Sequence, residues 1–397
     1  MKKIAIIGFG VVGSGVYEII RKNKELLTKK AGEEIDVKRV LDIRDFSDHE
    51  EKELFTKDFN DILNDSEISI VVETMGGIKF AYDYTKAALC AGKSVVTSNK
   101  ELVAAHGDEF FRIAKENNVR YLYEASVGGG IPIIRPLAND VSANEVEEIS
   151  GILNGTTNYI LTKMFRENDS FDAALKTAQE LGYAEKDPTA DVDGIDASRK
   201  ISILMSLATG KKIDSESVHT VGIRNITAED VAYAAAIGCT IKLIGNGFVK
   251  DGKANASVEP MLIPESCPLA GVVDVFNGVM VKGNMVDNLM FYGRGAGKLP
   301  TASAVMGDVV DIVRNSEYNP YFSWDGKADF IPYEEVCAKF FVRIDGSEKD
   351  KVKEIFGETE IIKGVSDYGF VTPVMTIGEL EKKLSAINVV SKIRLFK

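Results

Sequence analysis

Short apolar runs alternate with amphipathic stretches at the start of the chain. Residues 4–7 are a continuous apolar run that ends in glycine, a pattern typical of a strand buried on both faces of a sheet. Further strands are predicted at 37–41, 68–72 and 94–96, and helices at 14–23 and 81–91. Because helices separate the strands, we expect a Rossmann-type doubly wound parallel sheet.

The pattern changes in the middle of the chain and again near its end. Strands are predicted at 145–153 and 254–260, and helices at 170–181, 196–209 and 301–314. After a linker at 325–327, the segments 338–344, 349–356, 360–365, 370–375, 377–384 and 389–395 follow the order βαββαβ. That order is typical of a ferredoxin-like module.

We therefore expect an α/β protein with several domains, since 397 residues exceed what one ordinary domain holds. A Rossmann domain is predicted at 1–133 and is completed by 298–322. A second, α+β domain is predicted at 134–297, and the C-terminal module at 334–397.

Composition restricts the possible functions. The formal net charge is −12 and no stripe rich in Lys or Arg stands out, which argues against nucleic-acid binding. No apolar run approaches the ~20 residues that span a bilayer, so no membrane association is expected. The four cysteines are scattered, without metal-binding or disulfide spacing. A reducing compartment, and hence a cytoplasmic protein, is therefore expected.

A glycine-rich turn lies between the first predicted strand and the first predicted helix. It reads Gly8-Phe9-Gly10-Val11-Val12-Gly13. Gly8 allows a tight turn, Gly10 lets the backbone approach a pyrophosphate, and Gly13 permits close packing of helix on strand. N–H groups at the helix N-terminus can bind the anion. In this context we favour a dinucleotide site over a merely structural turn.

The ribose end of such a cofactor is recognised near the end of the second strand. Asp42, Arg44 and Asp45 lie there. A carboxylate would select NAD, whereas Arg44 could bind the 2′-phosphate of NADP. All three could also be solvated loop charges, and the choice between NAD and NADP stays open.

Two further segments follow predicted strands, where ligands of open α/β sheets collect. One contains Thr74 within 73–77, and the other contains Ser98 and Lys100 within 97–100. Lys100 can reach both a nicotinamide and a substrate, although an exposed lysine is otherwise an ordinary surface charge.

Three glycines, at 128–130, follow a strand and come soon after Glu124. The carboxylate and the freed carbonyls could form an all-oxygen cation site. From the spacing alone, a flexible hinge is favoured over that site.

The most distinctive segment is 182–200. Asp196 and Lys200 are four residues apart on a predicted helix, so they can pair. An exposed pair of this kind contributes only a few tenths of a kcal/mol and is weak evidence of function. The loop before it carries Glu185, Asp187, Asp191 and Asp193, which offer partners to a cationic group of a substrate.

Together these segments, with 151–160 and 293–305, resemble homoserine dehydrogenase over roughly residues 1–320. The resemblance implies interconversion of L-homoserine and L-aspartate 4-semialdehyde, with NAD or NADP carrying the hydride, in threonine, methionine and isoleucine biosynthesis. It also implies a homodimer or a higher oligomer, with the second domain providing catalysis and dimer contacts.

The resemblance also implies a role for each matching residue. Lys200 is the acid/base lysine, Asp196 its partner, and Lys100 a lysine beside cofactor and substrate. Glu185 holds the substrate ammonium, and we add Asp191 to the substrate site. Gly297 closes on the cofactor. A sodium site is formed by Glu124 with the carbonyls of Val127, Gly129 and Ile131.

The tail resembles part of an ACT domain, an amino-acid-sensing module. The Asp-x-Pro-Gly loop of that family is missing, because residues 344–350 contain no proline. The module is therefore a degenerate ACT-like domain, and threonine binding and simple dimerisation both stay open.

Two other functions fit the sequence less well. Aspartate-semialdehyde dehydrogenase needs an activated cysteine. Cys90 and Cys239 lie in apolar stretches, where we expect packed thiols. A sensor that has lost catalysis would not need the Glu185, Asp196 and Lys200 set.

Overall fold

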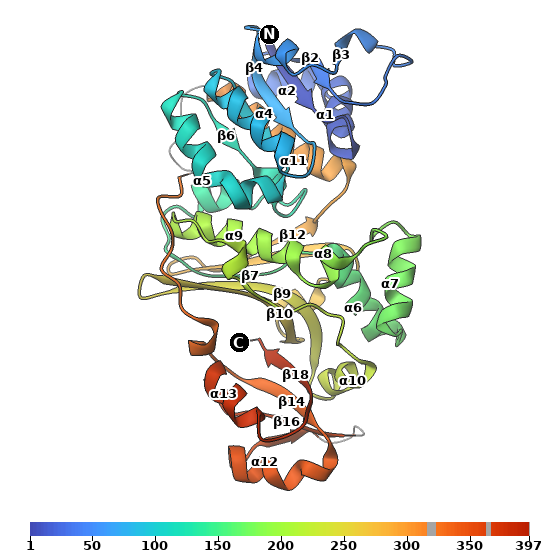
Figure 1. Ribbon diagram of the computed structural model, residues 1–397, viewed down its shortest axis with the longest axis vertical. Helices are drawn as coiled ribbons and strands as arrows, with labels where there is room; N and C mark the ends of the chain where they lie inside the picture. Colours follow the sequence, from blue (N-terminus) through green and yellow to red (C-terminus); the bar gives the residue numbers. More distant parts are fainter. Residues whose placement is uncertain (316–322, 363–366, 397) are drawn as a thin grey trace. The chain divides into compact units, whose positions relative to one another are not determined.

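The structure, a computed structural model, describes residues 1–315, 323–362 and 367–396 (Figure 1). It divides into two compact units. Unit 1 consists of Met1–Glu145, Ser202–Ser215 and Gly293–Ala328. Unit 2 consists of Val146–Ile201, Glu216–Tyr292 and Asp329–Lys397. No helix within the described ranges is long and apolar enough to cross a membrane.

Unit 1 contains a six-stranded parallel sheet in the order β3-β2-β1-β4-β5-β6. Its strands are β1 (Lys2–Ile7), β2 (Ile35–Leu41), β3 (Phe55–Thr56), β4 (Ile68–Glu73), β5 (Ser94–Thr97) and β6 (Tyr121–Leu122). Its helices include α1 (Val11–Lys22), α2 (Lys24–Ala31), α3 (Asn60–Leu63), α4 (Lys79–Cys90), α5 (Lys100–Glu116) and α11 (Lys298–Arg314). The predicted doubly wound parallel sheet is confirmed, and its strand order is that of dinucleotide-binding folds.

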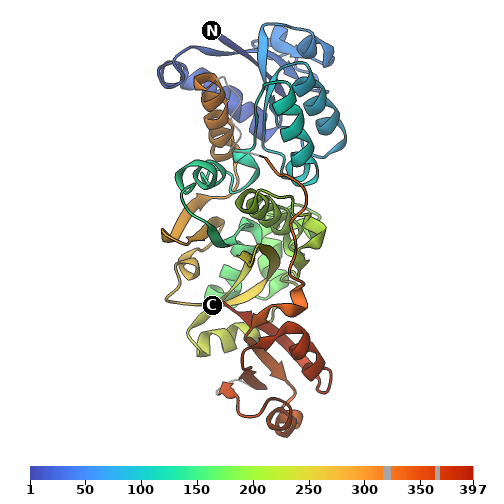
Figure 2. The same ribbon diagram turned by 90° about the vertical axis from the view of Figure 1, so that its left-hand side faces the viewer.

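The first helix begins earlier than the sequence pattern suggested. Gly10 is its N-cap, so α1 starts at Val11, directly after the glycine turn, and not at Ser14. Gly15 of α1 allows α11 to pack closely, since a Cβ there would lie 2.9 Å from the Lys298 carbonyl oxygen. α11 accordingly lies alongside α1 in both views (Figure 1 and Figure 2). The chain thus returns to unit 1 through Gly293–Ala328, and residues 316–322 lie outside the described residues.

Unit 2 contains a ten-stranded sheet in the order β12-β11-β7-β9-β10-β18-β14-β16-β15, with β8 beside β10. Its strands before the tail are β7 (Val146–Ile152), β8 (His219–Thr220), β9 (Cys239–Lys250), β10 (Lys253–Pro264), β11 (Phe276–Gly283) and β12 (Asp287–Arg294). Its helices before the tail are α6 (Gly155–Glu167), α7 (Phe171–Glu180), α8 (Thr189–Val192), α9 (Ile195–Thr209) and α10 (Ala228–Ala236). Some of these strand and helix bounds extend beyond the unit as divided above.

A long hairpin forms the centre of this sheet. Asp251 and Gly252 both have positive φ, 52° and 74°, as a two-residue hairpin turn of this hand requires. The turn joins β9 to β10 in a continuous antiparallel register. The predicted strand at 254–260 is therefore the middle of a longer one, and β9 was not predicted.

The tail folds as β13 (Cys337–Ala338), β14 (Phe340–Ile344), α12 (Lys349–Phe356), β15 (Glu360–Ile362), β16 (Tyr368–Val371), β17 (Met375–Thr376), α13 (Ile377–Leu384) and β18 (Val389–Leu395). Two predicted strands are each divided in two, 338–344 into β13 and β14 and 370–375 into β16 and β17. The second break falls at Pro373, which cannot donate to a ladder. Part of the predicted strand 360–365 lies outside the described residues.

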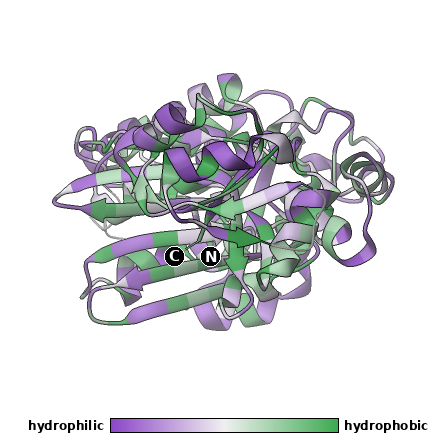
Figure 3. Ribbon diagram, turned by 90° about the horizontal axis from the view of Figure 1, so that it is seen from below, coloured by the Kyte–Doolittle hydropathy of each residue, from purple (hydrophilic) through white to green (hydrophobic). Residues whose placement is uncertain are grey.

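The four main tail strands have the order β18-β14-β16-β15, which is the ferredoxin-like arrangement. Alternate residues of β14, Phe340, Val342 and Ile344, join the core with α12 and α13. Phe341 of the other face packs on Tyr233 of α10. In Figure 3, hydrophobic and hydrophilic segments alternate along several strands. β18 pairs with β10, so the tail continues the sheet of unit 2 and is not a separate body.

Candidate active site

The glycine turn of unit 1 is held by backbone contacts. Gly8 has φ +90°, and a Cβ at Gly13 would lie only 2.0 Å from the Gly8 carbonyl oxygen. The Thr74 hydroxyl donates to that same oxygen at 2.7 Å. A Cβ at Gly10, in contrast, would meet nothing within 4 Å. Gly8 and Gly13 are thus required by the fold, whereas Gly10 leaves open space for a ligand.

The end of β2 carries an ion pair beside this turn. Asp42 accepts a hydrogen bond from the Phe9 N–H at 2.8 Å and pairs with the Arg44 guanidinium at 2.9 Å. Hydrogen bonds from Arg44 lower the pKa of Asp42 to about 2. Arg44 also donates to the Phe9 carbonyl at 2.7 Å. The Asp42 carboxylate is therefore engaged within the protein.

A cavity of about 260 Å³ lies next to this pair. Its lining includes the basic residues Arg44, Lys52 and Lys57 and the Phe46 ring, over which the Arg44 guanidinium lies at 5.2 Å. Within the part of the chain that the structure describes, neither lysine forms an ion pair. These positive charges can accept an anionic group of a ligand.

The ends of β4 and β5 are joined by a buried carboxylate. Glu73 accepts hydrogen bonds from the Thr97 hydroxyl and, at 2.8 Å, from the Met75 N–H. Burial raises the pKa of Glu73. Asn99 caps α5 by accepting from the Leu102 N–H at 3.1 Å. Ser98 and Lys100, which flank this cap, therefore occupy the predicted edge of the sheet.

The Glu124 carboxylate is hydrogen-bonded to the backbone that follows the three glycines. It is buried, and it accepts hydrogen bonds from the N–H groups of Ile133, Ile134 and Arg135 at 2.6, 2.9 and 2.8 Å. The Arg135 guanidinium lies 3.2 Å from the same carboxylate. No group of three or more His, Cys, Asp or Glu suited to a metal ion occurs in the described residues. The carboxylate itself therefore holds the backbone that follows the glycines.

Gly297 is brought back to unit 1 by the start of α11. It has φ +124° and serves as the N-cap of that helix. The next residue, Lys298, pairs with Glu18 of α1 at 2.7 Å. The segment that contains Gly297 therefore runs along the helix that follows the glycine turn.

In unit 2, Lys200 is held in a buried polar network on α9. Its Nζ donates to Asp196 Oδ2 at 2.7 Å and to the Leu153 carbonyl at 2.8 Å. The Lys200 and Asp196 side chains are 10% and 5% exposed. The sequence spacing alone suggested an exposed i,i+4 pair that contributes little to stability. The structure shows that this pair is buried. A buried ionic pair needs further polar partners to be tolerated.

Asn154 supplies those partners, and sequence reasoning did not assign it a role. Its amide nitrogen donates to Asp196 Oδ2 at 2.9 Å and to Asp191 Oδ1 at 2.7 Å. Its amide oxygen caps α6 by accepting from the Thr157 N–H at 2.9 Å. Asn is a preferred N-cap residue, but the helix that follows it, α6, was not predicted. The pairing to residues far along the chain carried no sequence signal.

The acidic loop before α9 is only partly joined to this network. Asp191, on α8, belongs to it, whereas Asp193 pairs with Arg224. Glu185 is exposed, and its carboxylate accepts no hydrogen bond from the described residues. Gly222 lets the loop pack tightly, since a Cβ there would lie 2.2 Å from the Val192 carbonyl oxygen.

The cysteines differ in their surroundings. Cys239 is buried, and burial raises the pKa of its thiol, which disfavours the thiolate. Cys90 is exposed at the end of α4, so the expectation that it is packed was wrong. Cys90 is the last residue of the amphipathic helix α4 and lies on its solvent-exposed side.

A parallel sheet that opens with a glycine turn, and a lysine fixed in a buried network, are the elements of a dinucleotide-dependent oxidoreductase. The family profile "Homoserine dehydrogenase" matches residues 132–310, and the profile "Homoserine dehydrogenase, NAD binding domain" matches residues 8–124. The chain belongs to the homoserine dehydrogenase family. The expected resemblance and the expected class of enzyme are thereby confirmed.

Relatives agree along most of the chain. The homoserine dehydrogenase of Bacillus subtilis is 38% identical over 92% of this chain and 86% of its own. That of Lactococcus lactis is 45% identical over 79% of this chain and 74% of its own. A crystal structure of a homoserine dehydrogenase from Thiobacillus denitrificans has a TM-score of 0.92 at 36% identity, covering 100% of this chain and 98% of that one.

A hyperthermophilic archaeal homoserine dehydrogenase in complex with NADPH has a TM-score of 0.68 at 30% identity. It covers 80% of this chain and 98% of its own. A nicotinamide cofactor is thus supported for the family fold found here.

Proposed function

We propose that the protein catalyses the NAD(P)-dependent interconversion of L-homoserine and L-aspartate 4-semialdehyde, a step in threonine, methionine and isoleucine biosynthesis. The observation that carries the proposal is the buried Lys200, with Asp196 Oδ2 at 2.7 Å and the Leu153 carbonyl at 2.8 Å. An ammonium held in this way is oriented to act on one substrate atom.

The chemistry follows from that arrangement. Reduction of the aldehyde adds a hydride to carbon and a proton to oxygen. The nicotinamide supplies the hydride when it is bound. Lys200 stabilises the charge that develops on the oxygen and donates the proton, and in the reverse direction it accepts that proton. Asp196 positions Lys200, and Lys100 is assigned to contact both cofactor and substrate.

Two carboxylates are assigned to the amino group of the substrate. Glu185 is exposed and accepts no hydrogen bond from the described residues, so a substrate ammonium can pair with it. Asp191 is fixed at 2.7 Å by Asn154, which links the substrate group to the network around Lys200.

For the cofactor, we propose a preference for NADP over NAD. The Asp42 carboxylate, which would otherwise bind the ribose hydroxyls of NAD, is engaged by Arg44 and by the Phe9 N–H. Arg44, Lys52 and Lys57 line the neighbouring cavity and suit a 2′-phosphate. Phe9, Gly10, Val11 and Val12 of the turn, with Thr74, Ser98 and Gly297, are assigned to the rest of the cofactor.

We also propose a sodium site formed by Glu124 together with three backbone carbonyls. The carbonyls of Val127, Gly129 and Ile131 accept no hydrogen bond from the described residues, and carbonyl oxygens suit a hard cation. Glu124 fixes the backbone nearby through Ile133 to Arg135. A bound sodium ion would stabilise this turn.

In the cell, we propose a cytoplasmic homodimer or higher homo-oligomer. An amino-acid effector at the C-terminal module is a second hypothesis, motivated by the ferredoxin-like strand order of β14 to β18. Calorimetric titration with threonine tests it, and a flat trace at millimolar concentration counts against sensing.

The main test follows absorbance at 340 nm with L-homoserine and each cofactor in turn. We expect reduction of NADP at a higher kcat/KM than that of NAD. An absence of turnover with homoserine and both cofactors, in a folded protein that still binds NADPH, would contradict the proposed function. Thiol alkylation is expected to leave the rate largely unchanged, which separates this activity from that of a cysteine-dependent dehydrogenase.

A further inference from the structure

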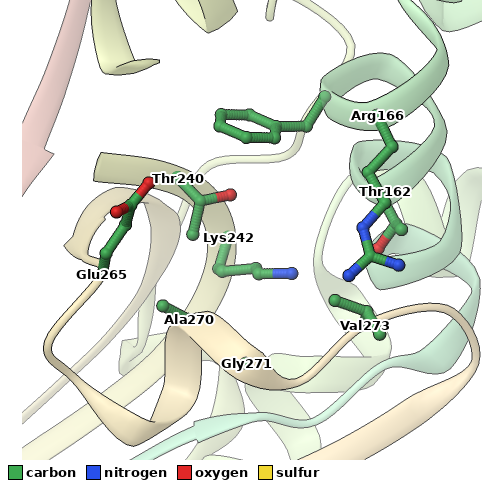
Figure 4. Close-up of a pocket in the computed structure, with 9 residues that line it drawn as sticks. Thr162, Arg166, Thr240, Lys242, Glu265, Ala270, Gly271 and Val273 are labelled. Carbon is green, nitrogen blue, oxygen red and sulfur yellow. The ribbon is translucent and has the colours of Figure 1, made fainter. Parts of the chain in front are cut away.

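A second cavity in unit 2 is lined by side chains that the proposed reaction does not use. It has a volume of about 260 Å³ and lies among α6, β9 and the segment 265–273 (Figure 4). Its lining residues are Thr162, Phe165, Arg166, Thr240, Lys242, Glu265, Ala270, Gly271 and Val273. Both a lysine and an arginine thus line a space large enough for a small molecule.

Lys242 is the most unusual of these residues because it is a buried cation. It is 2% exposed, and its Nζ donates to Asn158 Oδ1 at 3.0 Å and to the Val272 carbonyl at 2.7 Å. Both acceptors are neutral. An ammonium has three N–H donors, so one donor has no acceptor among the described residues. No carboxylate of the described residues forms an ion pair with this ammonium, although the nearby Asp274 charge favours its charged form. A buried charge with only neutral hydrogen-bond partners is costly, and here the cost is only partly offset.

Hydrogen bonds to the backbone fix the orientation of the Asn158 side chain beside Lys242. Its amide nitrogen donates to the carbonyls of Phe276 and Val272, at 3.0 and 3.3 Å. Its amide oxygen therefore faces Lys242. The ammonium is held in one place beside the cavity and does not reach bulk water as an ordinary surface lysine would.

Arg166 faces the same cavity from the last turn of α6. It is exposed and forms no ion pair within the described residues. Figure 4 shows its guanidinium and the Lys242 ammonium both extending into the space, while the Glu265 side chain lies across the cavity with its carboxylate beside Thr240. Burial, with a smaller effect of the Arg166 charge, lowers the pKa of Lys242 to about 8, so the lysine remains largely charged at pH 7.

We infer that this cavity binds a small oxyanion, the carboxylate or phosphate group of a metabolite, between Lys242 and Arg166. Such a group accepts the unused N–H of Lys242 and a forked pair of hydrogen bonds from Arg166. It also removes the repulsion between the two cations. The Thr240 hydroxyl, which has no hydrogen bond to the described residues, is available on the same wall.

Binding here has a direct route to the catalytic network, a consequence that rests on the proposed function. α6 carries Asn158 and Arg166 at the cavity, and its N-cap is Asn154, which holds Asp191 and Asp196. A displacement of this helix by a bound anion changes the position of Asp196 and hence of Lys200. The oxyanion site is therefore inferred to modulate turnover.

Calorimetric titration of the full chain with inorganic phosphate, and separately with malonate, tests the binding. The titrations are made at pH 7 and constant ionic strength. The buffering species is a cation with chloride as its counter-ion, so that the buffer itself is not a competing oxyanion. We expect one saturable site, weakened about tenfold or more by Arg166→Gln. Lys163→Gln is the matched control, since it removes the same charge from the same helix outside the cavity, and it should change affinity less than about twofold.

The outcomes separate the possible ligands. Tighter binding of phosphate assigns the site to phosphate groups, and tighter binding of malonate assigns it to carboxylates. Absence of saturable heat with both, or equal weakening by Arg166→Gln and Lys163→Gln, would overturn the site. Lys242→Met keeps the length of the buried chain and should abolish binding, so binding retained in that folded variant would also overturn it.

A rate measurement tests the link to catalysis. Phosphate titrated into the homoserine assay should change kcat in the parent protein and in Lys163→Gln, but not in Arg166→Gln. An unchanged kcat in the presence of calorimetric binding would contradict the coupling through α6. A protein that binds phosphate but never oxidises homoserine would contradict the proposed function and leave the site intact.

Discussion

The glycine turn of unit 1 and the lysine network of unit 2 are constructed in opposite ways. The turn comes from six consecutive residues, and its geometry is fixed by the backbone. A Cβ added at Gly13 would lie only 2.0 Å from the Gly8 carbonyl oxygen. The network comes from side chains of Asn154, Asp191, Asp196 and Lys200, which three different helices position.

This difference determines how each region responds to substitution. In the turn, a Cβ added at Gly13 would collide with the backbone, whereas a Cβ added at Gly10 would enter open space. The two glycines are therefore not equivalent. In the network, removal of one side chain leaves buried polar partners unsatisfied, so each loss affects several groups. The first region is tested by adding atoms and the second by removing them.

The largest effect is expected from Lys200→Ala. It removes the proposed proton donor, so kcat should fall by roughly 10²–10⁴-fold. The dissociation constant for NADPH, measured by fluorescence quenching, should remain within about twofold of the parent value, because a catalytic group contributes to the transition state.

Lys163→Ala provides the control, because Lys163 also pairs with an acidic residue four positions away on a helix, Glu167. The Lys163 and Glu167 side chains are 23% and 55% exposed, more than those of the Lys200 pair, so loss of the pair should leave kcat unchanged. If Lys200→Ala weakened NADPH binding and turnover to the same extent, the lysine would be structural.

The next largest effect is expected in the turn. Gly13→Ala forces its Cβ against the Gly8 carbonyl, which should cost on the order of 1–3 kcal/mol in the free energy of unfolding and weaken NADPH binding at least about tenfold. Gly10→Ala meets no atom within 4 Å, so it should leave the melting temperature unchanged to about 2 °C while still raising the KM for NADPH. Equal destabilisation by both variants would show that Gly10 is also structural.

The same difference explains what the sequence could predict. The turn, the parallel sheet and the helix carrying Asp196 and Lys200 follow local rules, since a glycine pattern or a helical spacing is set by neighbours in the chain. The βαββαβ order of the tail was also predicted, and helices 349–356 and 377–384 have the bounds expected.

What could not be predicted depends on distant parts of the chain. The burial of the Asp196 and Lys200 pair, and the role of Asn154, require β7 and α6 to lie against α9. The hydrogen bonds to the Glu124 carboxylate come from Ile133, Ile134 and Arg135, and no local pattern indicates them. The Asp251-Gly252 turn that follows β9 is a sequence signal that could have predicted the hairpin of β9 and β10. No sequence signal indicates the pairing of β18 with β10.

A smaller effect on stability is expected from Asn154→Ala. Loss of the N-cap should cost ~0.5–2 kcal/mol in stability, and misplacement of Asp196 should lower kcat by about tenfold to 100-fold with little change in KM. Asn154→Ser separates the two roles, because serine can cap α6 but cannot donate to both carboxylates. Recovery of stability without recovery of kcat is expected, and full recovery of kcat would assign Asn154 to capping alone.

The smallest effect is expected from Arg44→Ala, which removes the proposed 2′-phosphate ligand. The KM for NADPH should rise about tenfold while that for NADH stays within about twofold, as measured at 340 nm. Lys29→Ala, which removes a charge from α2 outside this cavity, should change neither value. Equal increases for both cofactors would contradict recognition of the 2′-phosphate.

Arg44→Ala also tests the ion pair with Asp42 through the dependence of stability on pH. The folded pKa of Asp42, about 2, lies below the ordinary value of ~3.9 for an aspartate, so the carboxylate stabilises the folded state above that value. The contribution is lost as pH falls through about 4 toward 2, because the unfolded chain binds the proton first. The difference in melting temperature between the parent protein and Arg44→Ala should therefore be constant from pH 5 to pH 7 and decrease below about pH 4. A difference that instead persisted unchanged at pH 2, in the folded protein, would mean that Arg44 stabilises unit 1 mainly through Phe9 and not through the Asp42 charge.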